Sequence, residues 1–323
     1  MARLTLKELH EAAIGVGIEF DPRGKEFITA ELARRKKDFE KISDSKKKAL
    51  FDQETLWNPY IDTRLLNGDE RTEIKKVIVG VDMEAPEVLL TDRLNEKGAG
   101  IDCVIAHHPE GRAYANFYEV MDMQAEILRS HGVPITQAEG ALGKRIREVG
   151  RSVAPVNHTR AVDHAKLLGI PMCCMHTVAD NQVDNFLAKL VEEKKPYNVG
   201  DILDMLNEIP EFQMASANNS KPVLFNGSEK NRCGKIYFHM TGGTSGSEEE
   251  MEQLANAGIG TLVVMHIPDK HRERCEKSYI NIVCAGHMGS DSVGLNLLFS
   301  RIMAATKKEF DIVATAGYYY VKR

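Results

Sequence analysis

The chain has 323 residues, of which 43% are hydrophobic and 28% are charged, and its formal net charge is −5. This length and composition allow one large or two medium hydrophobic cores. The weakly acidic balance argues against nucleic acid as a partner, and no apolar stretch approaches the ~18 residues that a membrane span requires. The first residues also lack the apolar segment of a secretion signal, so we expect a cytoplasmic protein with no membrane partner.

Residues 1–64 are strongly charged and follow a mostly helical pattern. Two basic runs, at residues 34–37 and 46–48, are interleaved with acidic residues. Such runs can contact nucleic acid, but we interpret them as the solvated faces of helices. We therefore assign residues 1–64 to a charged helical extension.

The sequence changes near residue 74 and then alternates between short β-branched runs and amphipathic segments. Strands are predicted at residues 76–82, 102–106, 133–136 and 171–175, and helices at residues 86–97, 119–130 and 159–168. This alternation predicts a largely parallel sheet that is covered by helices on both faces. We assign residues 65–205 to a first α/β lobe.

Residues 206–232 are rich in Pro, Asn, Ser and Gly, and we expect loops and a lobe boundary there. The alternation then resumes, with strands predicted at residues 235–240, 261–266 and 280–285 and helices at residues 247–257 and 292–307. Residues 310–321 contain three consecutive tyrosines and are predicted to form an edge strand or a subunit contact. We assign residues 206–323 to a second α/β lobe, whose C-terminal helix and strand can pack back on the first. The predicted fold class is α/β, with two lobes and mostly parallel sheets.

Three predicted strands end in residues that can bind a metal. These residues are His107 and His108, then His176 and Asp180, then His287 and Asp291. Because ligands gather outside the carboxyl ends of strands in α/β sheets, we expect all three segments to face one crevice. Such a mixed set of nitrogen and oxygen donors suits Zn, Mn, Fe, Co or Ni. Each residue alone is compatible with a surface histidine or a helix-capping aspartate, but their recurrence favours a metal site.

A glycine-rich segment, residues 240–247, lies between a predicted strand and a predicted helix. Free amides at such a position can bind phosphate, but three glutamates follow at once and repel an anion. Ser247 and Glu250 instead match a capping box. His266 and His271, further along, are additional candidates to line the pocket.

Taken in chain order, these motifs resemble the NIF-three-like family, whose members are also called GTP cyclohydrolase I type 2 homologues. The resemblance covers about residues 65 to 300. It rests on the run 65–69, a strand ending in Asp82, Ala106-His107-His108-Pro109, His176-Thr177-x-x-Asp180, residues 242–246, and Gly286-His287-x-x-Ser290-Asp291. It implies two α/β lobes around a cleft that holds two metal ions, assembled into a ring-shaped hexamer.

The resemblance also implies a ligand set. His107 and Asp180 would bind one ion and His108 and His287 the other, with Asp291 between the two. The family usually has glutamate at this bridging position, and aspartate is one methylene shorter. The occupancy of the second metal position therefore stays open.

The implied function is metal-dependent hydrolysis of a nucleotide, phosphoester or cyclic amide, with two divalent ions (Zn, Fe, Mn, Co or Ni) as cofactors. His271 or His266 would then act as general acid or base. Two alternatives stay open. One is a metallochaperone or cofactor-biosynthesis protein that delivers iron, with a metal donor or acceptor as its partner instead of a small-molecule substrate. The other is a regulatory or scaffolding ring, a homo-oligomer in which the basic N-terminal helix docks.

Overall fold

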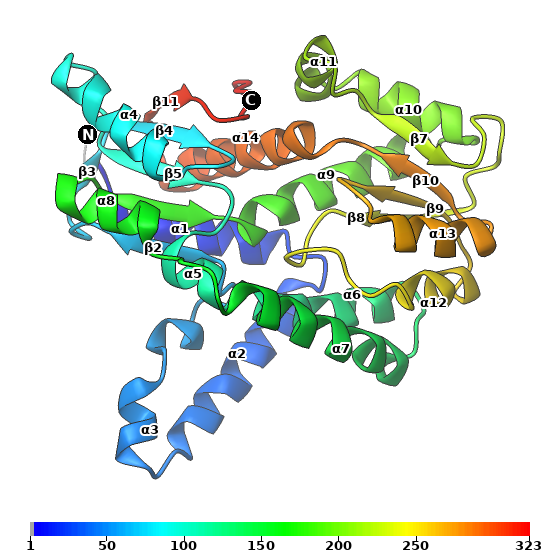
Figure 1. Cartoon of the computed structure of the whole chain (residues 1–323), viewed down its shortest axis with the longest axis horizontal. Coiled ribbons are helices and arrows are strands. Elements are labelled where there is room, and N and C mark those ends of the chain that lie inside the picture. Colours follow the sequence, from blue (N-terminus) through cyan, green and yellow to red (C-terminus); the bar gives the residue numbers. More distant parts are fainter. Residues whose placement is uncertain (1–2) are drawn as a thin grey trace.

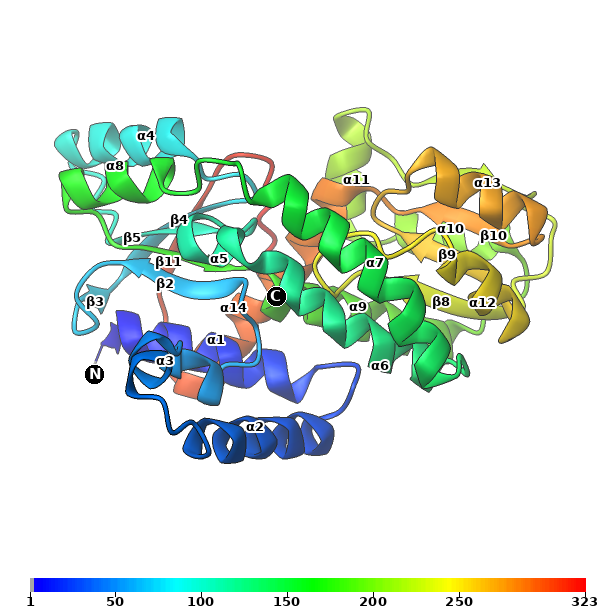
Figure 2. The ribbon, with the colours of Figure 1, turned by 60° about the horizontal axis from the view of Figure 1, so that its bottom comes forward.

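The computed structural model describes residues 3–323, which form two α/β lobes lying side by side along the longest axis (Figures 1 and 2). The first lobe contains a five-stranded sheet in the order β11-β4-β5-β6-β2. Its strands are β2 (Thr63–Asn67), β4 (Lys76–Gly80), β5 (Cys103–Ala106), β6 (Met172–Met175) and β11 (Asp311–Ala314). Neighbouring strands are parallel except β2, which runs antiparallel to β6.

The second lobe contains a four-stranded sheet in the order β7-β10-β9-β8. Its strands are β7 (Val223–Asn226), β8 (Lys235–His239), β9 (Ile259–Val264) and β10 (Asn281–Cys284), and only β7 is antiparallel to its neighbour. A small antiparallel pair joins β1 (Leu4–Thr5) to β3 (Glu73–Ile74). The predicted α/β class with two mostly parallel sheets is therefore confirmed.

Helices cover both faces of each large sheet. Their bounds are α1 (Leu6–Glu19), α2 (Lys25–Glu40), α3 (Ser45–Leu50), η1 (Gln53–Leu56), α4 (Ala85–Glu96), α5 (Gly111–Ala115), η2 (Phe117–Asp122), α6 (Met123–Ser130), α7 (Ile135–Val153), α8 (Arg160–Leu168), α9 (Thr177–Lys194), α10 (Val199–Asn207), α11 (Pro210–Ala217), α12 (Glu250–Asn256), α13 (Asp269–Lys277) and α14 (His287–Thr306). Of the helices in residues 3–323, none is long and apolar enough to cross a membrane.

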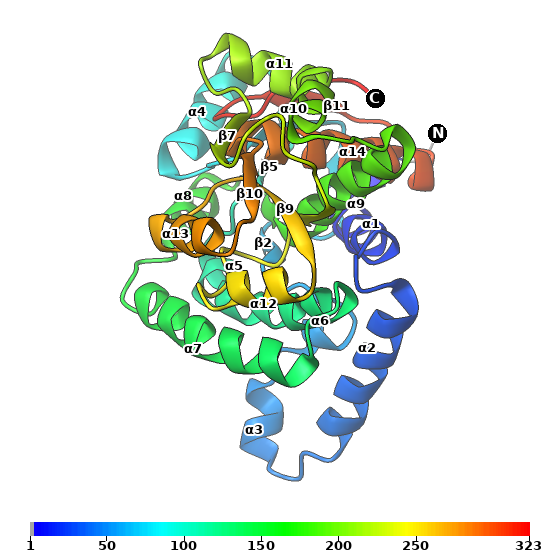
Figure 3. The ribbon, with the colours of Figure 1, turned by 90° about the vertical axis from the view of Figure 1, so that its right-hand side faces the viewer.

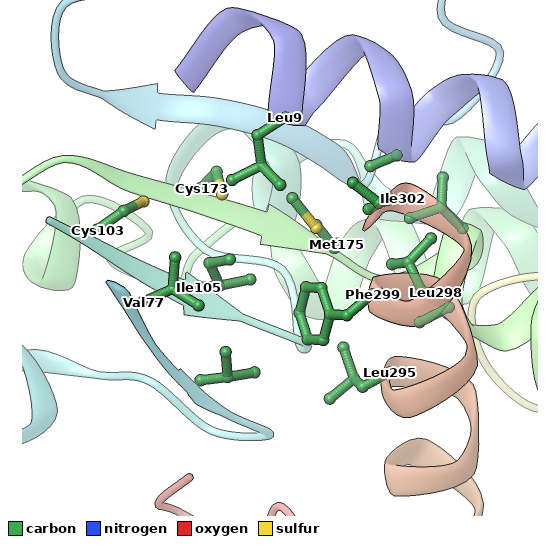
Figure 4. Close-up of a cluster of buried hydrophobic side chains, with 14 of the residues drawn as sticks. Leu9, Val77, Cys103, Ile105, Cys173, Met175, Leu295, Leu298, Phe299 and Ile302 are labelled. Carbon is green, nitrogen blue, oxygen red and sulfur yellow. The ribbon is translucent and has the colours of Figure 1, made fainter. Parts of the chain in front are cut away.

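The core of the first lobe explains why its strands are apolar on both faces. Every residue of β5 and β6 is buried, as expected for central strands of a covered parallel sheet. Figure 4 shows Ile105 and Met175 of this sheet together with Leu9 of α1 and Phe299 of α14, all in one cluster. Helices α4 and α8 close the opposite face of the sheet. The N-terminal helix α1 is therefore part of this core.

Two long helices connect the lobes and carry the site. Helix α9 begins directly after β6, and α14 begins directly after β10. The two helices pack against each other between the lobes (Figure 1). The C-terminal half of α14 then enters the first core, and β11 joins the first sheet beside β4. The C-terminal helix and strand thus pack back on the first lobe.

Three local predictions were wrong. The strand predicted at residues 133–136 is the start of α7, because Pro134 occupies the N-cap position of that helix. The loop region 206–232 contains α11 and the edge strand β7. Of residues 310–321, only Asp311–Ala314 form an edge strand, and the tyrosines follow it. The lobe boundaries at residues 64 and 205 stay predictions.

Candidate metal centre

Three strand ends bring the predicted ligands together. His107 and His108 directly follow β5, and Asp180 lies in the first turn of α9 after β6. His287 and Asp291 lie in the first turns of α14 after β10. The first lobe therefore supplies three of these side chains, and the start of α14, a helix that lies between the lobes (Figure 2), supplies two.

Asp291 lies at the centre of this group and is 1% exposed. Its Oδ1 is 3.5 Å from Nε2 of His107. Its Oδ2 is 3.5 Å from Nε2 of His287 and 3.8 Å from Nε2 of His108. Asp180 Oδ1 is 3.4 Å from the same Nε2 of His107. The two oxygens of Asp291 therefore face two different sets of donors.

The residues present fit a divalent cation. Within residues 3–323, Asp180 Oδ1 and both carboxylate oxygens of Asp291 are buried and accept no hydrogen bond. A buried carboxylate without a partner is costly, and a cation would compensate it. Three groups of donor atoms are close enough to hold an ion: His107, His108 and His176; His108, His287 and Asp291; and His107, Asp180 and Asp291.

In His107, His108 and His176, the ring nitrogen Nδ1 contacts a group behind the site. Nδ1 of His107 lies 3.2 Å from the Met175 carbonyl oxygen, Nδ1 of His108 lies 2.6 Å from Asp82 Oδ1, and Nδ1 of His176 lies 2.8 Å from Asp62 Oδ2. Such contacts fix the orientation of a metal-binding imidazole and leave Nε2 free for the metal. All three histidines therefore present Nε2 to the same space.

The electrostatics of the cluster favour the metal-binding forms of Asp291 and His287 but not of every ligand. Burial raises the pKa of Asp180, and the nearby carboxylates of Asp291 and Asp180 raise the pKa of His107 although its burial opposes this. Burial alone would raise the pKa of Asp291, but the nearby imidazoles of His107, His287 and His108 hold it below its usual value. Burial lowers the pKa of His287 to about 4, despite the opposing charge of Asp291. Metal binding requires deprotonated ligands. A carboxylate and a neutral imidazole are therefore available near pH 7.

The strand-end pattern included His176, but the ligand set that the resemblance implies left it out, and the sequence did not predict the supporting roles of Asp62 and Asp82. His176 is a member of one donor group, and its Nε2 is 3.7 Å from Asp180 Oδ2. Its spacing four residues before Asp180 was a usable signal, because residues four apart share one face of a helix. Asp62 and Asp82 gave no such signal, since each contacts its histidine only through the folded sheet.

The two predicted acid–base histidines lie in different places. His266 lines the pocket of the metal ligands, and its ring centroid is 5.2 Å from that of His287. His271 is buried behind the glycine-rich segment, where its Nε2 lies 3.0 Å from the Gly246 carbonyl oxygen, and it lines a neighbouring pocket. His239 of β8, which was not predicted, also lines the metal pocket, and burial lowers its pKa to about 4.

The glycine-rich segment forms one wall of the metal pocket. Gly242 and Gly243 have φ values of 98° and 88°, which favour glycine. The Gln124 amide of α6 donates to the carbonyl oxygens of Gly242 and Thr244 at 2.6 and 2.7 Å. Hydrogen bonds from Gln124 to two of its carbonyl groups therefore fix the segment, and Thr244 faces the pocket.

A buried glutamate ends this segment and makes folding pH-dependent. Glu250 is 2% exposed and accepts a hydrogen bond from the Ser247 backbone N–H at 2.9 Å, which is one of the two contacts of the predicted capping box. The other contact is not made within residues 3–323, because Ser247 Oγ has no partner and α12 begins at Glu250 with Glu249 as its N-cap. Burial raises the pKa of Glu250 from 4.5 to about 7, although the hydrogen bond from the Ser247 N–H opposes the shift. Between pH 4.5 and about 7, Glu250 is therefore still protonated in the folded state but already deprotonated in the unfolded state. Stability from this group falls as the pH rises from about 4.5 to 7.

Glu250→Gln is expected to be more stable than the native protein at pH 8 by about 1–3 kcal/mol, because the neutral amide avoids the buried charge. At pH 4 the difference should vanish, since glutamate is then neutral in both states. Urea denaturation at the two pH values measures this. The exposed Glu252→Gln on the same helix is the control, with no pH-dependent difference expected, because Glu252 is not among the groups that shift the pKa of Glu250. An equal effect of Glu250→Gln at both pH values would contradict the assignment.

Asn181 connects the site to the N-terminal segment. Its Oδ1 accepts a hydrogen bond from Thr241 Oγ1 at 2.7 Å, and Thr241 lines the metal pocket. Its Nδ2 donates to the Gly17 carbonyl oxygen and to Tyr60 Oη, both at 3.2 Å. Because Asn181 follows Asp180 directly, the N-terminal segment contacts the residue beside a predicted ligand.

A close approach of the two long helices sets the separation of the carboxylates. A Cβ atom at Gly294 of α14 would lie 2.6 Å from the Ala179 carbonyl oxygen of α9. Gly294→Ala is therefore expected to push the helices apart next to Asp180 and Asp291, lowering the free energy of unfolding by about 1–3 kcal/mol and weakening metal binding.

Urea denaturation and metal titration check this prediction. Gly15→Ala on α1 is the matched control, because nothing lies within 4 Å of a Cβ there. It should stabilise the helix by roughly 0.5–1 kcal/mol and leave metal binding unchanged. If both variants behaved alike, the close approach would not matter to the site.

These features define a class of protein: a two-lobed α/β fold with a buried His/Asp cluster that could bind metal. A NIF3 superfamily protein from Sphaerobacter thermophilus has a similar structure, with a TM-score of 0.70 over 80% of this chain and 91% of that chain at 28% sequence identity. Reduced HcgD from Methanocaldococcus jannaschii is more distant, with a TM-score of 0.49, 14% identity and coverage of 78% and 88%. A Bacillus cereus protein related to NIF3 has a TM-score of 0.45, 11% identity and coverage of 78% and 90%.

No family model matches the sequence, and no curated protein matches it. The structural likeness nevertheless confirms the resemblance to the NIF-three-like family: this chain has the fold of the NIF3 superfamily.

Proposed function

We propose that this protein binds two divalent metal ions, one on each side of Asp291, and hydrolyses a small molecule such as a nucleotide, phosphoester or cyclic amide. The observation that carries the proposal is the carboxylate of Asp291, which is buried and has no hydrogen-bond donor among residues 3–323. Its Oδ1 faces His107 and its Oδ2 faces His108 and His287. One carboxylate between two donor sets is the arrangement that a bridging ligand needs.

Two such ions, when bound, lower the pKa of a shared water and offset negative charge on the attacked group. The protein's own contribution is to orient the substrate and move a proton. His266 lies at the exposed side of the pocket and is the proposed general acid or base. Thr244 and Ser245, on the glycine-rich wall, can donate hydrogen bonds to polar groups of the substrate.

Unequal exposure of the two donor sets favours a second candidate function, delivery of a metal without turnover. The side chains of His107 and Asp180 are 1% and 5% exposed. Those of His108 and His287 are 28% and 35% exposed. We propose that the ion at His108 and His287 exchanges faster, as a protein that passes on a metal would require. A shorter bridging side chain, Asp291 in place of the family's usual glutamate, would add to this difference.

A turnover screen of the metal-loaded protein separates the two functions. The proposal predicts hydrolysis of at least one of the three substrate classes, abolished by a chelator. His266→Ala should lose turnover and keep its metal content, whereas the control His164→Ala on α8 should keep both. Absence of turnover, combined with transfer of one equivalent of metal to a competing chelator, would support delivery and contradict hydrolysis.

A further inference from the structure

Helices α2 and α3 form an arm, residues 25–50, that projects from the rest of the molecule (Figure 3). Ile28 is the single buried residue of α2, and α3 has none among its described residues. An amphipathic helix normally gains most of its stability by burying one face against a neighbour. The arm therefore contributes little to the core of its own chain and leaves most of its surface exposed.

The tip of the arm is basic and carries one exposed apolar residue. Lys46, Lys47 and Lys48 are exposed on α3, and Leu50 is 88% exposed. Residues 25–50 contain nine Lys and Arg against five Asp and Glu, whereas the whole chain has 42 against 47. The arm is thus a cationic element on an acidic protein.

A groove of about 720 Å³ separates the arm from the body of the molecule. Phe39, Ile42 and Phe51 give its arm side an apolar surface. One cation lines the groove, Arg35, which is paired with Glu31. Four carboxylates line it: Asp38, Asp52, Glu119 and Asp122.

Within residues 3–323, the carboxylates on the body side of the groove, Glu119 and Asp122, form no ion pair, although the charge of Arg35 acts on both. Burial and the neighbouring Asp122 raise the pKa of Glu119, and burial and the neighbouring Glu31 raise the pKa of Asp122. A cationic segment in the groove would relieve this repulsion. The apolar arm side offers a place for one hydrophobic side chain of the same segment.

We infer that this groove receives the arm tip of a second copy of this chain, so that two copies exchange tips in a symmetric pair. The lysines of one tip would face Glu119 and Asp122 of the other copy, and Leu50 would pack against Phe39 and Phe51. Each copy carries both the arm tip and the groove, as a two-fold symmetric interface requires. The inference goes beyond the proposed function, because no residue of the arm lines the metal pocket.

Charge reversal on each half of the contact tests the inference. A tip variant carries Lys46→Glu, Lys47→Glu and Lys48→Glu, and a groove variant carries Glu119→Lys and Asp122→Lys. All five positions are exposed, so both variants are expected to fold. By sedimentation velocity, each variant alone should dissociate into a smaller species, with a dissociation constant raised about tenfold or more.

An equimolar mixture of the two variants should restore the assembly of the native protein, because both tip–groove contacts then join opposite charges. A control with the same charge change elsewhere, Lys195→Glu, Lys221→Glu and Lys230→Glu, should assemble like the native protein. Native protein that remains monomeric, variants that assemble normally, or a mixture that fails to recombine would each overturn the inference. So would loss of nucleic-acid binding in the tip variant with unchanged assembly.

Discussion

Asp291→Asn is expected to lose at least one of two bound metal equivalents and to bind the other at least about 100-fold more weakly. The amide keeps the shape of the side chain but removes its charge, and its NH₂ group cannot bind a metal. Loss of a group that merely orients a ligand already costs about 10–100-fold in metal affinity, so loss of a shared ligand should cost more. Calorimetric titration and elemental mass spectrometry measure the affinity and the metal content.

Asp184→Asn is the matched control for this prediction. Asp184 lies one turn after Asp180 on α9 and is also buried, but it belongs to none of the candidate donor groups. The control should keep both metal equivalents, although the loss of the Asp184 charge lowers the pKa of Asp180. Native metal content in Asp291→Asn would remove Asp291 from the site.

Leu9→Ala is expected to lower the free energy of unfolding by about 2–5 kcal/mol, the usual range for truncating a buried leucine. Leu9 is fully buried in the cluster that joins α1 to the first sheet and α14 (Figure 4). Leu50→Ala, at an 88% exposed position, should change stability by less than about 0.5 kcal/mol. Urea denaturation of both variants gives the comparison, and equal stabilities would show that α1 is not part of the core.

Because no ligand candidate lies in the N-terminal 60 residues, the sequence predicts that they are dispensable for metal binding, but the packing of α1 argues against this. Residues 1–64 contain none of the predicted ligands, yet α1 completes a core and Asp62 holds His176. A chain that begins at Leu65 should therefore unfold or lose metal, even though every predicted ligand remains. Sequence patterns could not reveal this, because the packing of α1 depends on α14, which lies far along the chain.

The alternation of strands and helices was predictable because buried parallel strands are short and apolar on both faces. Residues 171–175 and 280–285 illustrate this, since both form central strands with few polar residues. The error at residues 133–136 has a local cause. Val133 and Ile135 resemble a strand, but Pro134 caps a long helix whose amphipathic face packs on the second lobe.

The candidate site was predictable in part, because five of its donors lie at the end of a strand or in the first turns of the helix that follows one. His176 was recognised as a residue that can bind a metal but was left out of the ligand set that the resemblance implies. The hydrogen bonds of Asp62 and Asp82 join segments far apart in sequence, which neither periodicity nor spacing encodes. The separate positions of His266 and His271 likewise depend on how α13 packs behind the glycine-rich segment.

Anomalous diffraction from crystals of the metal-loaded protein tests the central claim most directly. The account predicts two anomalous peaks, one bound by His107 and Asp180 and the other by His108 and His287, with Asp291 contacting both. Data recorded on both sides of an absorption edge would identify each element. The absence of any peak at Asp291, or peaks bound only by residues outside this cluster, would contradict the account.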